Sequence, residues 1–367
     1  MTETPQARLG YRPDLDALRA LAILGVLYTH FWNEAAPTGT LGVILFFGLS
    51  GFLITDILLS VRNRTEASGA PRLPALRNFF IRRALRLWPA YFLVLGVAVA
   101  FNFQNVRPVA GWHLFFLSNV LFSIRNDFVP WSMAAWWSLS LEEQFYLVWP
   151  ALVCLPPRKW LGTLVTALMV LGAVWHFAMD RIGDAGLAAY FLPPAAFIPL
   201  GGGAALALLR EKFGSIPRWV EWAGLAMLPL LGILLVTQWA DWVLETLIAL
   251  PLLALVAWGV REKRGNGPFL KLIRSRPVLW VGRVSYGIYL YHLFVKTGIA
   301  AMGPWLPAIA EPGPGMFVAG SLLTIALASL SWVLLEAPCN RLKRRFPYAA
   351  RPSSSHPSAQ IGVSSHS

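Results

Sequence analysis

Apolar residues dominate the chain in runs that are long enough to cross a bilayer as helices. Such a run needs about 17 to 25 residues, and about ten segments reach that length. Short segments that hold most of the charged side chains separate them. The pattern predicts an all-α polytopic membrane protein with about ten transmembrane helices. The runs begin near Leu15, Thr40, Trp88, Trp137, Trp160, Leu187, Trp219, Trp242, Val278 and Gly313.

One further apolar run, residues 109–123, is too short for a regular span, so we expect a short interfacial or re-entrant helix there. The basic residues support this interpretation, because Lys and Arg in short loops collect on the cytoplasmic side of a membrane. With ten spans, the outer segments hold only Arg107, Arg125 and Arg181. If residues 109–123 also crossed, most later basic segments would lie outside. Both termini are therefore predicted to be cytoplasmic.

The pattern also predicts the domain organisation. A separate soluble domain would need a long hydrophilic segment, and none is evident. We expect a single membrane domain over residues 15–336, a cytoplasmic N-terminal segment over 1–14 and a cytoplasmic tail over 337–367. After about residue 351 the tail is rich in Ser, Pro and His and has too little apolar surface to fold, so disorder is predicted there.

Composition agrees with the membrane interpretation and narrows the function. Of the 367 residues, 56% are hydrophobic and 13% charged, and the mean hydropathy is +0.57. The net charge of +13 would suggest nucleic acid in a soluble protein, but here it follows from basic loops, so no nucleic-acid partner is expected. Cys154 and Cys339 form no disulfide framework or metal motif, and no metal site is predicted.

Ionisable residues inside predicted spans are the candidates for function, because burying charge in a membrane is costly. Arg19 and His30 lie 11 residues apart in the first span, which places them on one helix face about 16 Å apart. Arg19 falls near the cytoplasmic edge and His30 in the outer third. The alternatives are an Arg19 that reaches the lipid headgroups and a His30 that only bonds a neighbouring helix.

Two further clusters contain charged side chains. Arg83 and Arg86 share a face where the third span begins, and two guanidinium groups so placed suit phosphate oxygens. Ordinary cytoplasmic anchoring is the alternative. Glu142 and Glu143 lie inside a span that runs from outside to inside, and Glu142 falls at a depth close to that of His30. A charge that only holds helices together is the alternative there.

A fourth cluster follows one stripe of the ninth span. Ser285, Tyr289 and His292 have the spacing i, i+4 and i+7, and we expect them to contact substrate or to support the site. Tyrosines in spans are more often structural hydrogen-bonding groups than catalysts. His113 and His176 belong to no such cluster and are interpreted as structural.

These segments, taken in their order along the chain, resemble acyltransferase family 3. Its members are bacterial membrane O-acyltransferases that modify surface polysaccharides, lipopolysaccharide, peptidoglycan, Nod factors and macrolides. The resemblance covers nearly the whole chain. It rests on Asp16-Ala17-Leu18-Arg19 ahead of His30, on Phe46-Phe47-Gly48-Leu49-Ser50-Gly51-Phe52, on Arg83-Ala84-Leu85-Arg86, on residues 138–146 and on Ser285 to His292.

The resemblance implies a ten-helix acyltransferase domain in the bacterial cytoplasmic (inner) membrane. It implies acyl-CoA, for example acetyl-CoA, as a donor substrate with no bound cofactor, and a glycan or lipid-linked glycan hydroxyl as acceptor. It also implies a catalytic His30, donor-binding arginines at Arg19, Arg83 and Arg86, and a functional Glu142. Some members carry an additional periplasmic esterase-like domain; here we expect the membrane domain to complete the transfer or to pass the group to a partner.

We therefore hypothesise that His30 removes the proton of the acceptor hydroxyl while Glu142 stabilises the imidazolium that forms. The arginines would bind the phosphates of CoA at the cytoplasmic side. An acyl-histidine intermediate is a second route that the sequence leaves open. The alternative function is a proton-coupled transporter, since about ten spans with buried charges can also form a substrate path. Only an enzyme releases the CoA thiol, so donor consumption separates the two functions.

Overall fold

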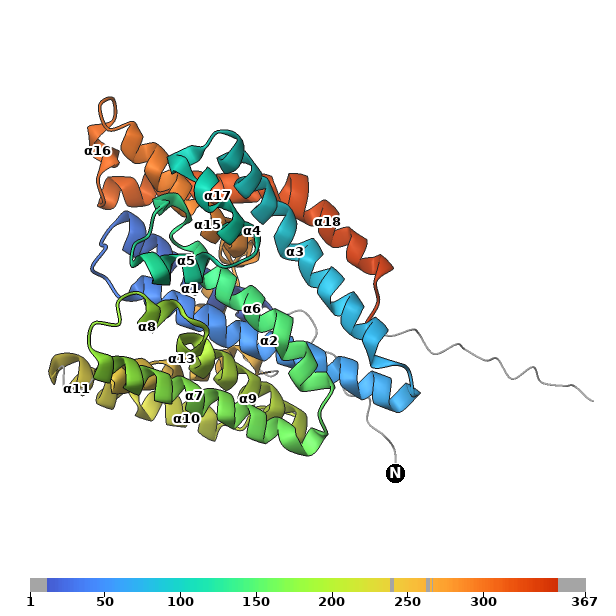
Figure 1. Cartoon of the computed structure of the whole chain (residues 1–367). Helices are drawn as coiled ribbons and strands as arrows, with labels where there is room; N and C mark the ends of the chain where they lie inside the picture. Colours follow the sequence, from blue (N-terminus) through green and yellow to red (C-terminus); the bar gives the residue numbers. More distant parts are fainter. Residues whose placement is uncertain (1–11, 238–240, 262–264, 266, 349–367) are drawn as a thin grey trace, which may run out of the picture.

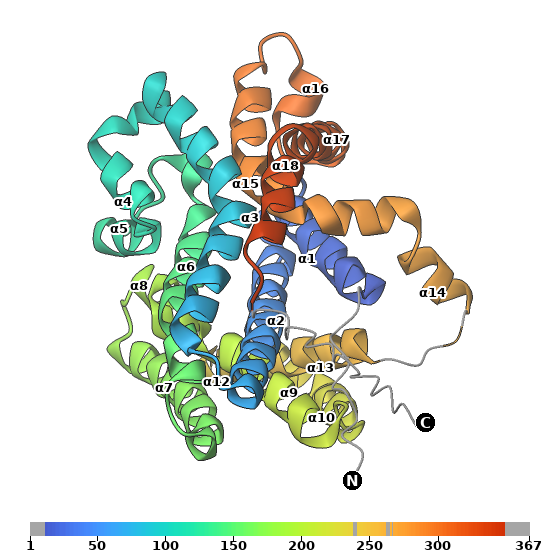
Figure 2. The same ribbon diagram turned by 90° about the vertical axis from the view of Figure 1, so that its right-hand side faces the viewer.

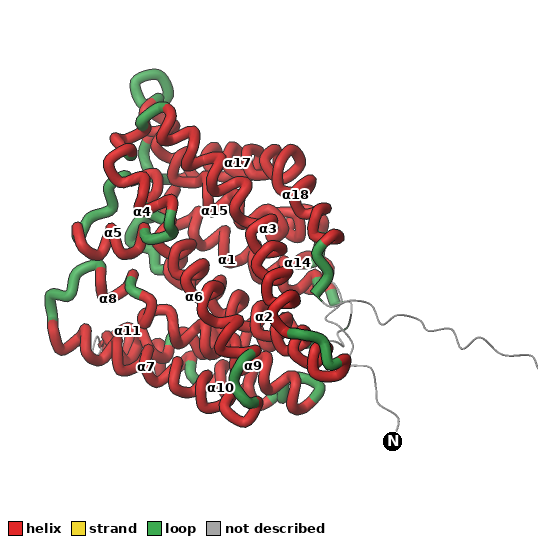
Figure 3. The backbone as a smooth tube through the Cα atoms, turned by 45° about the vertical axis from the view of Figure 1, so that its right-hand side comes forward, coloured by secondary structure: helices red, strands yellow, loops and turns green. Residues whose placement is uncertain are grey.

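A computed structural model describes residues 12–237, 241–261, 265 and 267–348. These residues form helices and connecting loops, with no β-strand among them (Figures 1 and 3). The longer helices are α1 (Pro13–Phe31), α2 (Thr38–Ser68), α3 (Arg72–Ala100), α6 (Trp136–Cys154), α7 (Leu161–Ile182), α9 (Phe197–Phe213), α13 (Ala249–Val260), α15 (Arg276–Ala301) and α17 (Pro314–Ser331).

Shorter helices connect the long ones. They are α4 (Ala110–Leu114), α5 (Ser118–Arg125), α8 (Ala188–Phe191), α10 (Trp219–Ala226), α11 (Leu228–Thr237), α12 (Asp241–Leu247), α14 (Pro268–Ile273), α16 (Pro307–Ala310) and α18 (Ala337–Arg341). A π-helical turn, Trp332–Glu336, joins α17 to α18. The predicted all-helical class is confirmed for the part of the chain that the structure describes.

Among the described residues, four helical segments are long and apolar enough to cross a membrane, namely Thr38–Ser68, Arg72–Ala100, Arg158–Ile182 and Pro314–Arg345. The number of ten spans and the cytoplasmic location of both termini stay predictions. The short apolar run 109–123 forms the two helices α4 and α5, which are five and eight residues long. Neither is long enough to cross a hydrocarbon core of about 30 Å.

The start of the predicted cytoplasmic tail is a packed part of the fold. Helix α18 lies along α3 in Figures 1 and 2, and Arg82 of α3 donates a hydrogen bond of 2.6 Å to the backbone oxygen of Lys343. The guanidinium of Arg82 also lies 4.4 Å from the ring centroid of Tyr348. Residues 337–345 are therefore helical, and the segment 337–348 is held against α3, whereas the region after residue 351, predicted to be disordered, lies outside the described residues.

Glycines allow α2 to approach its neighbours closely. A Cβ on Gly51 would clash with the backbone oxygen of Leu200 in α9, and one on Gly203 of α9 would clash with the backbone oxygen of Gly48. Small residues let membrane helices pack backbone against backbone. The glycines of the motif 46–52 thus hold α9 on one side of α2, which sits among the other long helices in Figure 2.

Helix α1 is fixed in the same way against α15. The backbone oxygen of Asp16 lies where a Cβ on Gly282 would be. Near the cytoplasmic end predicted for α1, Asp14 accepts hydrogen bonds of 2.7 and 2.9 Å from Arg274, just before α15 begins. These hydrogen bonds raise the pKa of Arg274. The close contact and the ion pair together set how α1 and α15 face each other.

We expect Gly282→Ala to destabilise the protein, because the new methyl group must push α15 away from the α1 backbone. Overpacking typically costs about 1–3 kcal/mol, and a backbone atom offers little room to relax. Gly298→Ala is the matched control on the same helix, since a Cβ there meets no atom within 4 Å. Thermal unfolding in detergent should show a lower midpoint for Gly282→Ala only; equal midpoints would contradict the contact.

Candidate functional site

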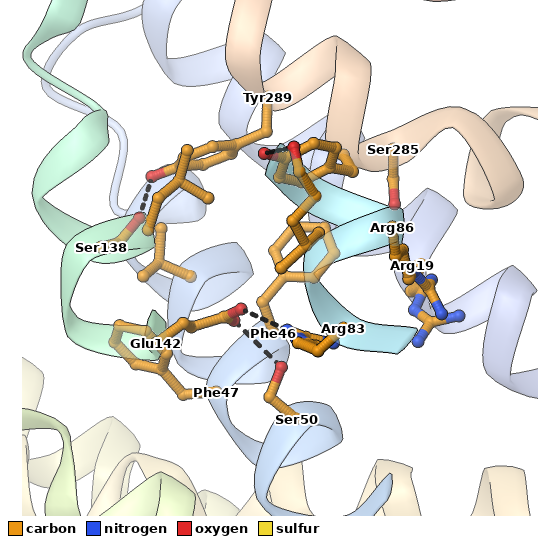
Figure 4. A pocket seen from close by; sticks show the side chains of 14 residues that line it. Arg19, Phe46, Phe47, Ser50, Arg83, Arg86, Ser138, Glu142, Ser285 and Tyr289 are labelled. Carbon is orange, nitrogen blue, oxygen red and sulfur yellow. Dashed lines mark hydrogen bonds and ion pairs between the residues drawn. The ribbon is translucent and has the colours of Figure 1, made fainter. Parts of the chain in front are cut away.

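A pocket opens between α1, α2, α3, α6 and α15, and it contains most of the predicted site residues (Figure 4). It holds about 600 Å³ of space free of protein atoms. Basic, acidic, hydroxyl and aromatic side chains share its wall, which is unusual for the interior of a membrane protein. The lining residues are Arg19, Val43, Phe46, Phe47, Ser50, Arg83, Arg86, Leu87, Ser138, Leu139, Glu142, Ser285, Tyr286 and Tyr289.

Glu142 is bonded through both carboxylate oxygens. Ser50 of α2 donates a hydrogen bond of 3.0 Å to Oε1, and Tyr146 donates one of 2.8 Å to Oε2. Arg83 lies 3.5 Å from Oε2 and supplies the counter-charge. Figure 4 shows the carboxylate between Ser50 and Arg83. The predicted pairing of Glu142 with His30 is absent from the described structure, because α2 and α3 contribute the partners instead.

Arg83 is enclosed by acidic and aromatic groups. Its Nε lies 3.9 Å from Oε1 of Glu143, and its guanidinium lies 3.7 Å from the ring centroid of Tyr146. Glu143 accepts a hydrogen bond of 3.3 Å from the indole of Trp88. Two carboxylates and an aromatic face thus compensate the charge of Arg83. This guanidinium holds α3 to α6 in addition to any contact that it makes with a ligand.

We expect Arg83→Ala to lower the free energy of unfolding by about 3 kcal/mol or more, the usual cost of breaking a buried ion pair by removing one partner. Glu142 and Glu143 would lose their counter-charge inside the fold. Arg86→Ala is the matched control, because Arg86 lies one helical turn further on. Its own midpoint of thermal unfolding should stay close to that of the wild type. A larger loss in Arg86→Ala would contradict this division of roles.

Arg86 lines the pocket without an ion-pair partner among the described residues. Arg19 of α1 pairs with Asp16 at 3.2 Å, and Arg83 pairs with the two glutamates. Two cationic groups, Arg19 and Arg83, lie near enough to act on Arg86, while the carboxylates of Asp16 and Glu336 act on it from beyond ion-pair distance. One side of the pocket therefore carries three guanidinium groups. Arg86 is the one of the three without a described ion pair, and an anionic ligand would neutralise its charge.

Hydroxyl groups close another side of the pocket. Tyr289 and Ser138 lie 2.7 Å apart through their oxygens, which joins α15 to α6. Tyr286 donates a hydrogen bond of 2.9 Å to the backbone oxygen of Leu87. Ser285 lines the pocket beside them. Two members of the predicted stripe on the ninth span, Ser285 and Tyr289, therefore face the pocket, and the tyrosine is part of a contact between helices.

The two histidines of the predicted site lie together, outside the pocket lining. The ring centroids of His30 in α1 and His292 in α15 are 5.0 Å apart. The ring of Tyr289, which does line the pocket, lies 5.4 Å from that of His292. His292 is completely buried, whereas His30 is half-buried and has the ion pair between Lys296 and Glu34 nearby. Tyr289 is thus the contact between the pocket and the histidine pair.

Sequence reasoning missed four side chains that complete the site. Ser50, Ser138, Tyr146 and Tyr286 all contribute hydroxyl groups to the pocket or to its carboxylate. Each lies in a segment that carried the family resemblance, but a serine hydroxyl in a membrane helix commonly bonds its own backbone, and a tyrosine in a span is more often a structural hydrogen-bonding group. Among the described residues, no three His, Cys, Asp or Glu side chains are grouped as metal ligands would be.

The fold and the pocket define a helical membrane protein with a cationic site that adjoins a histidine pair. A family model described as an acyltransferase domain matches residues 12–333. The chain belongs to this family of acyltransferases, which confirms the family inferred from the motifs. No solved structure matches the chain.

Curated relatives agree with the family. The chain is 30% identical to the peptidoglycan O-acetyltransferase OatA of Listeria monocytogenes over 370 residues, covering 93% of this chain and 58% of the relative. It is 27% identical to the O-acetyltransferase OatA of Staphylococcus aureus, covering 90% of this chain and 57% of the relative. The chain thus spans a little over half the length of these relatives.

Proposed function

We propose that the protein transfers an acyl group from acyl-CoA to a hydroxyl of a cell-wall glycan at the bacterial cytoplasmic membrane. The acyl group that we propose is acetyl. The observation that carries this proposal is the pocket with Arg86, which has no described ion pair, on one side and Tyr289 on another, where His292 connects Tyr289 to His30. The names of the relatives support an O-acetyl product, and OatA of L. monocytogenes is named for peptidoglycan.

The reaction needs a base. His30 takes the proton of the acceptor hydroxyl as its oxygen attacks the thioester carbonyl. The new C–O bond forms, the C–S bond breaks, and the proton passes to the thiolate, so that an ester and the CoA thiol result. His30 suits the role because its ring is half-buried and hydrogen-bonds to no other described residue.

The donor would enter along the arginines. Arg86 and Arg19 bind phosphate oxygens of CoA, and the pantetheine arm runs past Ser50 and Leu139 toward Tyr289. The hydrogen bond between Tyr289 and Ser138 must then break so that the thioester can reach the histidines. Glu142 acts through Arg83 in this proposal: it holds the guanidinium in place and keeps α2, α3 and α6 at the spacing that the arm requires.

The test is donor consumption with an added acceptor. The purified protein in detergent receives acetyl-CoA with soluble peptidoglycan fragments, and thiol release is followed while mass spectrometry looks for an added acetyl group on the glycan. Thiol release with an acetylated glycan supports the proposal. Vesicles that show pH-dependent solute uptake without thiol release would instead support the alternative function, a proton-coupled transporter.

A further inference from the structure

The backbone determines which nitrogen of His292 carries its proton. Nδ1 lies 2.7 Å from the backbone oxygen of Tyr289, one turn earlier in α15. A carbonyl oxygen only accepts hydrogen bonds, so Nδ1 must donate and must be protonated. The ring is completely buried and pairs with no carboxylate of the described residues, which favours its neutral form. Nε2 of His292 is therefore an unprotonated acceptor.

That acceptor has no hydrogen-bond partner in the described structure. Buried polar atoms without a partner are rare, and one that lies beside a possible donor is a candidate for a hydrogen bond that forms when the neighbouring group moves. The ring of His30 is the neighbour that can supply a donor, because centroids 5.0 Å apart allow facing nitrogens to approach to about 3 Å. Hydrogen bonds of catalytic groups commonly shorten only when substrate is bound.

We propose that His292 is the positioning residue for His30, its Nε2 accepting a hydrogen bond from one ring nitrogen of His30. The other nitrogen of His30 is then left bare and can take the proton of the acceptor hydroxyl. When His30 becomes imidazolium, the bond to His292 becomes charge-assisted and stabilises that cation. The inference rests on the proposed function, in which His30 is the base.

The neighbouring charged groups do not offer this bond. Both oxygens of Glu142 are bonded by Ser50 and Tyr146. Lys296 carries only donors, so it cannot accept a hydrogen bond from His30, and its ammonium is held by Glu34. A neutral histidine thus takes the place that the sequence suggested for Glu142, and its tautomer follows from a backbone carbonyl.

Two substitutions at His292 separate positioning from packing. In His292→Gln the side-chain amide reaches the position of Nε2 and can accept the bond, whereas in His292→Asn it reaches only the position of Nδ1. We expect His292→Asn to lower kcat at least about tenfold, a part of the 10²- to 10⁴-fold that a general base supplies. The KM for acetyl-CoA should stay unchanged, and His292→Gln should recover most of the lost kcat.

His113→Asn is the matched control. His113 is also fully buried, with Nδ1 bonded to Ser118 at 2.8 Å and Nε2 without a described partner, but its ring packs against Phe122 and Trp136 instead of His30. Its kcat should equal that of the wild type. If the Gln and Asn variants of His292 lost kcat equally, or if the KM for acetyl-CoA rose as kcat fell, the proposal that His292 positions His30 would be overturned.

A second measurement does not depend on activity. In ¹⁵N-histidine NMR of the protein in detergent, the signals of His292 are assigned by their loss in His292→Gln. They should show a protonated Nδ1 and an unprotonated Nε2. A protonated Nε2 would overturn the inference even in an active enzyme. A wild type that releases no thiol with any acceptor would instead overturn the proposed function, so the two failures are distinguishable.

Discussion

Replacing His30 by alanine is expected to lower the rate of acetyl transfer about 10²- to 10⁴-fold, the range that a positioned general base supplies. The alanine cannot take the hydroxyl proton, while the arginine side of the pocket remains intact. Because no other described residue hydrogen-bonds to His30, the fold should tolerate the change. Thiol release from acetyl-CoA with a glycan acceptor measures the effect.

The control for this experiment is His113→Ala, which removes a buried histidine whose ring packs against Phe122 and Trp136, away from the histidine pair. Both variants must elute as monodisperse species and unfold at comparable temperatures before rates are compared. Transfer by His30→Ala at the rate of the wild type would exclude His30 as the base. A loss of the same size in both variants would point to the fold instead of to catalysis.

Arg86→Ala is expected to raise the KM for acetyl-CoA about tenfold or more and to leave kcat nearly unchanged. A hydrogen bond to a charged group contributes about 1.5–3 kcal/mol, and Arg86 lines the pocket without forming an ion pair with a described carboxylate. The loss falls on binding because the phosphates of CoA lie far from the reacting carbonyl. Initial rates over a range of acetyl-CoA concentrations measure both constants.

A donor without phosphates tests the cause. S-acetylpantetheine carries the thioester and the arm of acetyl-CoA but not its phosphate groups. With this donor, wild type and Arg86→Ala should have the same KM. If the variant lost affinity equally for both donors, the guanidinium would act on the shape of the pocket and not on phosphate. Arg86→Lys should recover only part of the affinity, since an ammonium lacks the planar fork of a guanidinium.

Arg83 and Arg86 show where the sequence stops being informative. They share a helix face and a basic segment, so nothing in their spacing distinguishes them. The structure does, because α6 places Glu142 and Glu143 beside Arg83, whereas Arg86 forms no ion pair among the described residues. The sequence predicts that both arginines bind phosphate. In the structure Arg83 joins helices through its ion pairs, and Arg86 has no ion pair among the described residues.

Glu142 and His292 show a second limit of the sequence, which gives the depth of a residue in the membrane but not its partner on another helix. Depth in the membrane suggested that Glu142 would meet His30, since helix rise gives the height of a residue. Height does not give the direction around the bundle. Ser50 and Tyr146 take the carboxylate, and His292, predicted only as a support residue, is the ring that lies beside His30.

The sequence by itself determined the helical membrane class, the family, and a short set of residues that membrane burial would otherwise exclude. These properties follow from the length of apolar runs and from spacing along single helices, which are local in the chain. Only the tertiary structure decided which of the residues meet. Arg83, Glu142 and His30 each have a partner on another helix, and close glycine contacts such as that of Gly282 with Asp16 set how those helices face one another.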